Sequence, residues 1–299
     1  MTSEVIDAVI SARHCGNQSR PRDLESDMAK TALASELGVV EGTLEHGMPY
    51  LALGSGRPLA FLVWFTPDFA NPTGWMRAAM IKTLAPLAER FRVYAVNRAP
   101  GTPAGTTMAD IAARHADALR IEFGEPVDVI GVSSGGSIAL QLAADHPDVV
   151  RRLVVLSSGY RLDPNALVAQ RNYAEAVAAG RRGLHHGVDI TIKSPVLAAL
   201  ARPLLWLVDP LVRPKDPAGM LAYVRAEDGF DLTGRLGEID TPTLVLGGDR
   251  DACYSVENFR RTAEGLPNGR LIVYPGASHT GAVKDPRAVA DMLNFLTAD

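Results

Sequence analysis

The stretch Val127-Asp128-Val129-Ile130-Gly131-Val132-Ser133-Ser134-Gly135 decides the fold of this 299-residue chain. Its apolar first half predicts a buried strand, and the residues after Ser133 predict a helix that ends before Pro147. A G-x-S-x-G pentapeptide between a strand and a helix is typical of a nucleophile elbow. Glycines at 131 and 135 remove side chains that would collide in so sharp a turn. We therefore expect the Ser133 hydroxyl to project from the turn, beside the unpaired N–H groups that begin the helix.

Strand and helix patterns alternate on both sides of this stretch. Strand patterns at 38–46, 48–53 and 59–65 are separated by glycine turns, which predicts an antiparallel start to the sheet. Further strands are predicted at 91–96, 127–132, 150–156, 243–246 and 271–274, with helices at 76–90, 107–123, 134–146, 255–265 and 286–296. This alternation predicts an α/β fold in which a mostly parallel sheet of eight strands carries helices on both faces.

Two segments fall outside the alternation. Residues 1–36 are polar, and we interpret them as an N-terminal extension. Residues 160–238 lack strand patterns and contain several helical stretches, so we interpret them as a helical lid inserted between the sixth and seventh strands. The core of the fold then consists of residues 37–159 and 239–299.

Composition narrows the classes of partner. The chain has 30 basic and 34 acidic residues, a net charge of −4, and no long basic block, so nucleic acid is not an expected partner. Charged residues interrupt the most apolar run, residues 196–212, which makes it a poor membrane span. The first residues lack the pattern of a signal peptide. We expect a cytoplasmic protein that does not use a membrane. For Cys15 and Cys253 this favours two free thiols over a disulfide between them.

A nucleophilic serine needs a base and an acid that orients the base. Functional residues of parallel sheets gather beyond the carboxyl ends of the strands. Of the seven histidines, His279 lies in a glycine-flanked loop directly after a predicted strand, which favours it as the base. Two aspartates, Asp249 and Asp251, follow the preceding strand. Asp251 lies further into its loop and is the favoured acid, while Asp249 is suited to capping the turn.

These motifs identify the chain as resembling the α/β-hydrolase superfamily, over residues 38–298. The resemblance rests on Gly131-Val132-Ser133-Ser134-Gly135-Gly136, on residues 239–251, and on Gly276-Ala277-Ser278-His279. Within the superfamily the chain is similar to the capped esterase and lactonase-like group. The resemblance implies the order serine, aspartate, histidine along the chain and a lid between the sixth and seventh strands.

The chain departs from the family pattern after the third strand. Members usually carry His-Gly there, ahead of a backbone N–H that completes the oxyanion hole, but this chain has Thr66-Pro67-Asp68. Pro67 has no N–H to donate. The second donor is then expected from Asp68 or Phe69, alongside the N–H of Ser134, with the Asp68 carboxylate pointing away. Residues 97–101 also replace the usual acidic, glycine-rich turn, which predicts a reshaped loop.

The favoured function is hydrolysis of a carboxylic ester or lactone through an acyl-enzyme on Ser133. A lid predicts an apolar pocket for a medium-sized small molecule, with Tyr173, Trp206 and Phe230 as candidate lining residues. No metal-ligand spacing occurs, so neither metal nor cofactor is expected. A homodimer is compatible with the sequence.

Two other functions stay open from the sequence. The same three residues suit C–C bond hydrolysis, perhydrolysis, or a lyase or cyclisation step, and the unusual 66–68 loop gives this weight. The third possibility is a ligand-binding protein without activity. The presence of Ser133, Asp251 and His279 together argues against it.

Overall fold

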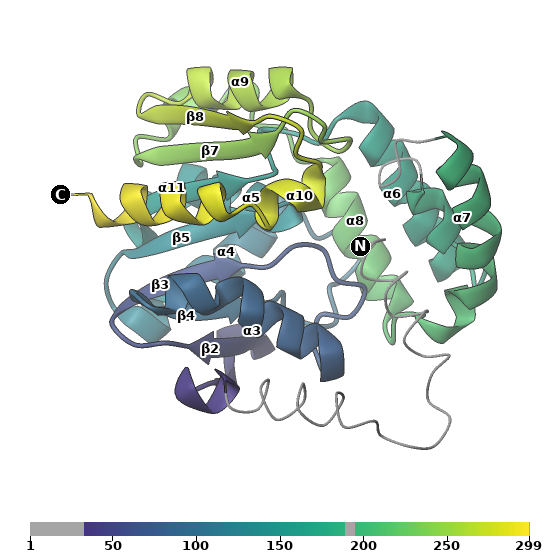
Figure 1. Cartoon of the computed structure of the whole chain (residues 1–299), viewed down its shortest axis with the longest axis horizontal. Coiled ribbons are helices and arrows are strands. Elements are labelled where there is room, and N and C mark those ends of the chain that lie inside the picture. The colour runs from purple at the N-terminus through teal and green to yellow at the C-terminus, as the bar shows by residue number, and fades with distance from the viewer. Residues whose placement is uncertain (1–32, 189–194, 299) are drawn as a thin grey trace.

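A computed structural model describes residues 33–188 and 195–298 (Figure 1). Its centre is an eight-stranded sheet in the order β1-β2-β4-β3-β5-β6-β7-β8. The strands are β1 (Val40–Leu44), β2 (Met48–Leu53), β3 (Arg57–Leu62), β4 (Phe91–Val96), β5 (Val127–Val132), β6 (Val150–Leu156), β7 (Thr243–Gly248) and β8 (Gly269–Tyr274). The prediction of an eight-stranded, mostly parallel sheet is confirmed.

Only β2 runs opposite to the other strands of the sheet. The pairs β1–β2 and β2–β4 are antiparallel, and every pair from β4 through β3 to β8 is parallel. All six residues of β5 are buried, as are all six of β7. Their near-continuous apolar sequence is typical of parallel strands covered on both faces. The carboxyl ends of β5, β7 and β8 therefore meet at one edge, which positions the loops that follow them.

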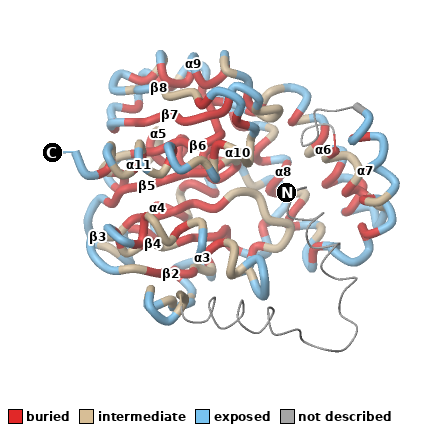
Figure 2. Tube along the Cα trace, viewed as in Figure 1, coloured by how far each residue is buried: buried red, intermediate tan, exposed pale blue. Residues whose placement is uncertain are grey.

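Helices cover both faces of the sheet (Figure 1). One face carries α3 (Gly74–Ala88) and α11 (Pro286–Thr297), whose buried residues share a core cluster with β3 and β4. The other face carries the second cluster, which includes residues of α4 (Met108–Phe123), α5 (Ser134–Asp145) and α9 (Val256–Gly265). Figure 2 shows the buried strands between these exposed helical surfaces.

The long connection between β6 and β7 is helical. It contains α6 (Pro164–Ala178), α7 (Pro195–Val208) and α8 (Pro217–Asp228), which lie beside the carboxyl ends of the strands (Figure 1). The β structure of this connection, among the described residues, is limited to an isolated bridge between Arg161 and Asp231. We call α6, α7 and α8 the inserted helices. A short helix, α10 (His279–Val283), follows β8.

The third strand is shorter than its sequence predicts. β3 ends at Leu62, whereas the apolar pattern extends to Phe65. The Val63 N–H still donates to the Val96 carbonyl on β4 at 3.2 Å. The Arg98 side chain donates to the carbonyls of Val63 and Trp64, at 3.2 and 3.1 Å. A guanidinium thus binds the carbonyls of this apolar segment where it leaves the sheet.

Three further expectations concern the cysteines, the N-terminal extension and a membrane span. The Cys253 thiol is free, while Cys15 and residues 1–32 of the expected N-terminal extension lie outside the described residues. In the described part of the chain, no helix combines the length and apolarity needed to cross a bilayer.

Replacing Gly135 by alanine is expected to destabilise the fold by about 3 kcal/mol. A Cβ at this position would lie 2.1 Å from the carbonyl oxygen of Leu62 and 2.7 Å from that of Val63, both backbone atoms that cannot rotate away. Urea denaturation measures the loss. Gly237→Ala is the matched control, since its Cβ would meet nothing within 4 Å and its free energy of unfolding should stay within about 1 kcal/mol of wild type. Equal stability of the two variants would contradict this account of the elbow.

Candidate active site

Ser133 occupies a strained turn between β5 and α5. Its φ of 54° and ψ of −122° place a non-glycine residue in a sparsely populated region, as a nucleophile elbow requires. The Ser133 N–H donates to the carbonyl of Leu156 on β6 at 2.9 Å, which fixes the turn against the sheet. A Cβ on Gly131 would lie 2.5 Å from the carbonyl oxygen of Gly135. The glycines of the motif are therefore required by close backbone contact across the turn.

His279 lies within hydrogen-bond distance of the serine. Its Nε2 is 2.9 Å from Ser133 Oγ, although 146 positions separate the two residues. His279 is the first residue of α10, so the loop expected at 275–281 contains a short helix. Ser157 Oγ donates to the His279 carbonyl at 3.0 Å, and the Tyr254 ring stacks on the imidazole at 6.1 Å between centroids. Backbone and ring are thus both held in place.

Asp251 holds the other nitrogen of the imidazole. Asp251 Oδ2 is 2.8 Å from His279 Nδ1, and its side chain is fully buried. Its second oxygen accepts N–H bonds from Cys253 at 2.8 Å and Tyr254 at 3.1 Å. A carboxylate that accepts at Nδ1 favours the tautomer whose Nε2 lone pair faces Ser133.

The competing aspartate has another partner. Asp249 Oδ1 accepts the N–H of Gly276 at 2.6 Å and so joins the loop after β7 to the loop after β8. Of the two candidates, only Asp251 has a recorded hydrogen bond to His279 in the described residues.

Asp251, Cys253 and His279 also form the group that comes nearest to a set of metal ligands in the described chain, with their ligand atoms within 4.8 Å of one another. Burial raises the pKa of the Cys253 thiol, which disfavours the thiolate that a metal would need. Both carboxylate oxygens and the imidazole Nδ1 are already engaged in hydrogen bonds. The donor set fits a serine–histidine–aspartate array better than a metal site.

The residues expected to form the oxyanion hole belong to α5 and to the loop after β3. Ser134 is the first residue of α5, so its N–H has no acceptor within the helix. In the loop, the Asp68 carbonyl accepts the Thr66 hydroxyl at 2.8 Å, and Asp68 Oδ1 accepts the N–H of Lys215 at 2.7 Å. This second bond directs the Asp68 carboxylate toward the segment that precedes α8.

A buried arginine joins these two parts of the chain. Arg98, only 2% exposed, donates to the Val63 and Trp64 carbonyls and to Ser134 Oγ. It also donates to Tyr223 OH on α8 at 3.1 Å and lies over that ring at 4.3 Å from its centroid. One guanidinium thus connects β3, α5 and the inserted helices beside the elbow. Sequence reasoning singled out loop 97–101 as reshaped but missed Arg98, although its place at the carboxyl end of β4 was a usable signal.

A buried carboxylate lies in the same polar cluster. Glu227 accepts hydrogen bonds from Ser137 Oγ at 3.2 Å and Gln170 Nε2 at 2.9 Å. Burial raises the pKa of Glu227, and the nearby Arg98 charge opposes that increase. The hydrogen-bond partners of the Glu227 carboxylate, Ser137 and Gln170, are neutral side chains.

The three residues expected to line a pocket have different environments. Tyr173 is buried and packs edge-on against Phe65, with ring centroids 6.3 Å apart. Phe230 is buried in the core cluster. Trp206 is 50% exposed, and the Arg182 guanidinium covers its ring at 3.6 Å. Their role in substrate binding stays a prediction.

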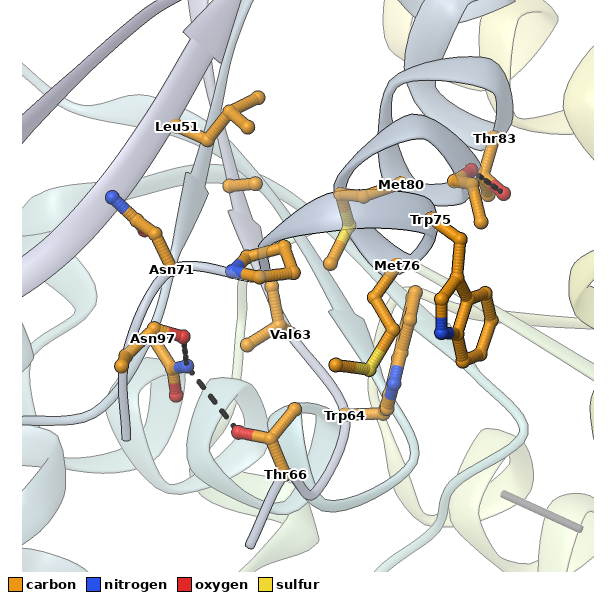
Figure 3. Close-up of a pocket in the computed structure, with 14 residues that line it drawn as sticks. Leu51, Val63, Trp64, Thr66, Asn71, Trp75, Met76, Met80, Thr83 and Asn97 are labelled. Atoms are coloured by element: carbon orange, nitrogen blue, oxygen red, sulfur yellow. Dashed lines mark hydrogen bonds between the residues drawn. The ribbon is translucent and has the colours of Figure 1, made fainter. Parts of the chain in front are cut away.

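A cavity of about 70 Å³ lies between α3 and the loop after β3 (Figure 3). Its lining is mostly apolar and includes Trp64, Trp75 and Met76, with Thr66 and Asn97 at its polar side. Asn97 Nδ2 donates to Thr66 Oγ1 at 3.3 Å and to the Ala70 carbonyl at 2.9 Å, which braces the loop. None of the three predicted pocket residues lines this cavity.

Comparison with known proteins agrees with this fold. A model of the alpha/beta hydrolase family matches residues 46–292. The chain belongs to this family. This α/β hydrolase is 31% identical over 240 residues to a Yersinia enterocolitica protein provisionally named carbamate hydrolase RutD, covering 72% of the chain and 81% of the relative. It is 30% identical over 186 residues to a pimeloyl-[acyl-carrier protein] methyl ester esterase of Neisseria meningitidis, covering 58% of each.

Solved structures share the fold of this α/β hydrolase. The thermophilic esterase of Thermogutta terrifontis superposes with a TM-score of 0.65 at 23% identity, covering 86% of this chain and 97% of the esterase. The enol-lactonase of Burkholderia xenovorans gives a TM-score of 0.64 at 20% identity, covering 87% and 100%. Together with the relatives in sequence, these matches support an enzyme of the hydrolase type.

Proposed function

We propose that this α/β hydrolase is a serine hydrolase that cleaves a carboxylic ester or lactone of a medium-sized, largely apolar substrate. The observation that carries the proposal is the chain of hydrogen bonds from Ser133 through His279 to the buried Asp251, at 2.9 and 2.8 Å. A serine hydroxyl becomes a useful nucleophile when a positioned base takes its proton.

Acylation begins when Ser133 Oγ attacks the carbonyl carbon and its proton moves to His279 Nε2. Asp251 stabilises the imidazolium that forms. The tetrahedral oxyanion accepts N–H bonds from Ser134 and from Asp68, where the family's glycine loop is replaced. His279 then gives its proton to the alcohol oxygen as the C–O bond breaks.

Deacylation repeats these steps with water. His279 removes a proton from water as the water oxygen attacks the acyl carbon, and the proton returns to Ser133 Oγ when the acid leaves. For a lactone, alcohol and acid belong to one molecule, which leaves as the ring-opened hydroxy acid.

Arg98 serves as a positioning residue in this scheme. It holds the carbonyls of Val63 and Trp64 on one wall and the Ser134 side chain on the other, so the two proposed donors keep a fixed separation. Its buried positive charge also favours an oxyanion in a site of low dielectric.

Replacing Arg98 by methionine is expected to lower kcat about 100-fold, with KM changed less than about threefold. The reason is that the hydrogen bonds to both walls are lost while the substrate-lining side chains remain. Steady-state kinetics on an activated ester measure the effect, and Arg98→Lys should recover part of kcat because it keeps the charge.

Arg151→Met is the matched control. Arg151 pairs with the buried Asp128 at the opposite end of β5, far from Ser133. Its loss is expected to lower stability while kcat stays within about threefold of wild type. Equal losses of kcat in the two variants would show that Arg98 acts only through stability.

The names of the relatives support a substrate that is cleaved at a carbonyl carbon. One is named a methyl ester esterase and another a carbamate hydrolase, and both terms describe cleavage at a carbonyl carbon. Phe65 is the partly buried member of an aromatic cluster with the buried Phe69 and Tyr223, at 5.6 to 6.0 Å between ring centroids, and supports an apolar substrate.

A panel of nitrophenyl esters of increasing acyl length, with lactones and a carbamate ester, tests the substrate class. Covalent labelling by a fluorophosphonate tests the nucleophile in the same preparation. Labelling with turnover of esters or lactones is the expected result. A folded protein that the probe does not label would overturn the proposal.

The alternative chemistry rests on the loop of Thr66, Pro67 and Asp68. Its departure from the usual glycine loop favours a reaction such as C–C bond hydrolysis, perhydrolysis, or a lyase or cyclisation step. Labelling of Ser133 without turnover of any ester, lactone or carbamate would favour this alternative.

A further inference from the structure

Helix α7 is apolar on both of its faces. Ala198, Ala201, Leu205 and Val208 form its buried face toward the rest of the fold. On the outer face, Leu200 is 68% exposed, Leu207 58% and Leu211, just beyond the helix, 83%. Figure 2 shows this exposed outer edge of α7. Surface helices of monomeric proteins usually carry polar residues on the outer face, so this one is unusual.

The exposed apolar residues are concentrated in this part of the chain. Of the twelve large apolar side chains that are exposed in the described residues, seven lie between residues 196 and 212. Single exposed apolar residues are ordinary, whereas a contiguous group marks an interaction surface. We call this group, from Val196 to Val212, the outer face of α7.

Basic residues outnumber acidic ones in the sequence around the outer face. The residues described within 181–215 include five cations and one carboxylate, Asp209, although the whole chain carries a net charge of −4. That carboxylate is buried and accepts the N–H groups of Gly183 and Leu184 at 2.7 and 2.8 Å. Arg182 lies directly over the exposed Trp206 ring. Arg213 pairs with Asp209 at 3.5 Å and donates to the Gly180 carbonyl at 3.0 Å, and so stays at the same end.

The charge pattern argues against a second copy as the occupant. A twofold interface places the same patch of both subunits together, which would bring the two sets of arginines near each other. An anionic partner removes that repulsion. The length of α7, fourteen residues, corresponds to about 21 Å, which is less than the hydrocarbon core of a bilayer.

We infer that the outer face of α7 docks on the surface of an anionic phospholipid bilayer. Leu200, Leu207 and Leu211 enter the boundary of the acyl chains, Trp206 lies at the level of the headgroups, and the arginines face the phosphates. The helix lies in the plane of the surface. The expectation that the chain does not use a membrane rested on the length of a span, and docking requires no span.

Vesicle binding by the full-length protein tests this inference. We expect co-sedimentation with vesicles of equal parts phosphatidylcholine and phosphatidylglycerol, a much weaker association with phosphatidylcholine alone, and a blue shift of tryptophan emission that Trp206→Phe abolishes. Leu200→Glu combined with Leu207→Glu should lower the partition coefficient at least about tenfold. Arg181→Glu should lower it about fivefold or more, with an effect that salt weakens.

Ile121→Glu is the matched control for the leucine changes. Ile121 is 68% exposed on α4, the same exposure as Leu200, and should leave vesicle binding unchanged. An equal loss from Ile121→Glu would overturn the inference. A wild-type protein that stays unbound at low salt would also overturn it. So would a dimer, measured by light scattering, that Leu200→Glu dissociates while vesicles bind neither form.

Discussion

Ser133→Ala is expected to lower kcat by about 10⁴- to 10⁶-fold on whichever ester the wild type turns over fastest. The change removes the oxygen that we propose accepts the acyl group, and the backbone of the elbow stays fixed by its bond to Leu156. The variant should also lose labelling by a fluorophosphonate. Mass spectrometry of the labelled protein, beside initial rates, measures both effects.

Ser255→Ala controls for loss of a serine elsewhere. Its side chain caps α9 by accepting the N–H of Asn258 at 3.3 Å. Its loss is expected to cost about 1 kcal/mol of stability and to leave labelling intact. A Ser133→Ala protein that keeps a tenth of wild-type activity would rule out Ser133 as the nucleophile.

Asp251→Asn is expected to lower kcat about 10⁴-fold at neutral pH. An asparagine amide directed at His279 Nδ1 donates a hydrogen bond where the carboxylate accepts one. The imidazole then takes the tautomer with its proton on Nε2 and no longer removes the proton of Ser133. Steady-state rates across pH, with circular dichroism to check the fold, measure the effect.

Asp249→Asn is the matched control, because it changes the same functional group two residues away. Its side-chain oxygen can still accept the N–H of Gly276, so kcat should stay within about threefold of wild type. A larger loss in Asp249→Asn than in Asp251→Asn would reverse the assignment of the acid.

The sequence predicts the sheet well because local patterns carry most of the information. β4, β5 and β6 begin and end where their apolar runs predict, since each run is bounded by turn residues or a helix start. β1, β7 and β8 differ from their predicted bounds by two residues at one or both ends. β3 ends three residues before its apolar pattern does, where Arg98, a residue 35 positions from Val63, binds the chain. No local pattern encodes such a contact.

Local patterns also predict part of the candidate site. Ser133, Asp251 and His279 each follow a strand whose carboxyl end lies at the same edge, so strand order alone predicts that they meet. Tyr254 and Arg98 were missed because their contacts depend on ring packing and on burial. The exposure of Trp206 depends on how α7 is rotated, which its apolar sequence leaves open.

The hydrogen bond between Ser133 and His279 spans 146 positions and depends on the placement of both β5 and the segment after β8. Contacts of such long sequence separation form late in folding, because the intervening chain must first be ordered. A refolding chain can therefore recover most of its secondary structure before it recovers activity. Recovery of activity would then show that β8 and the segment after it have reached their native place in the sheet. Circular dichroism alone does not reveal this step.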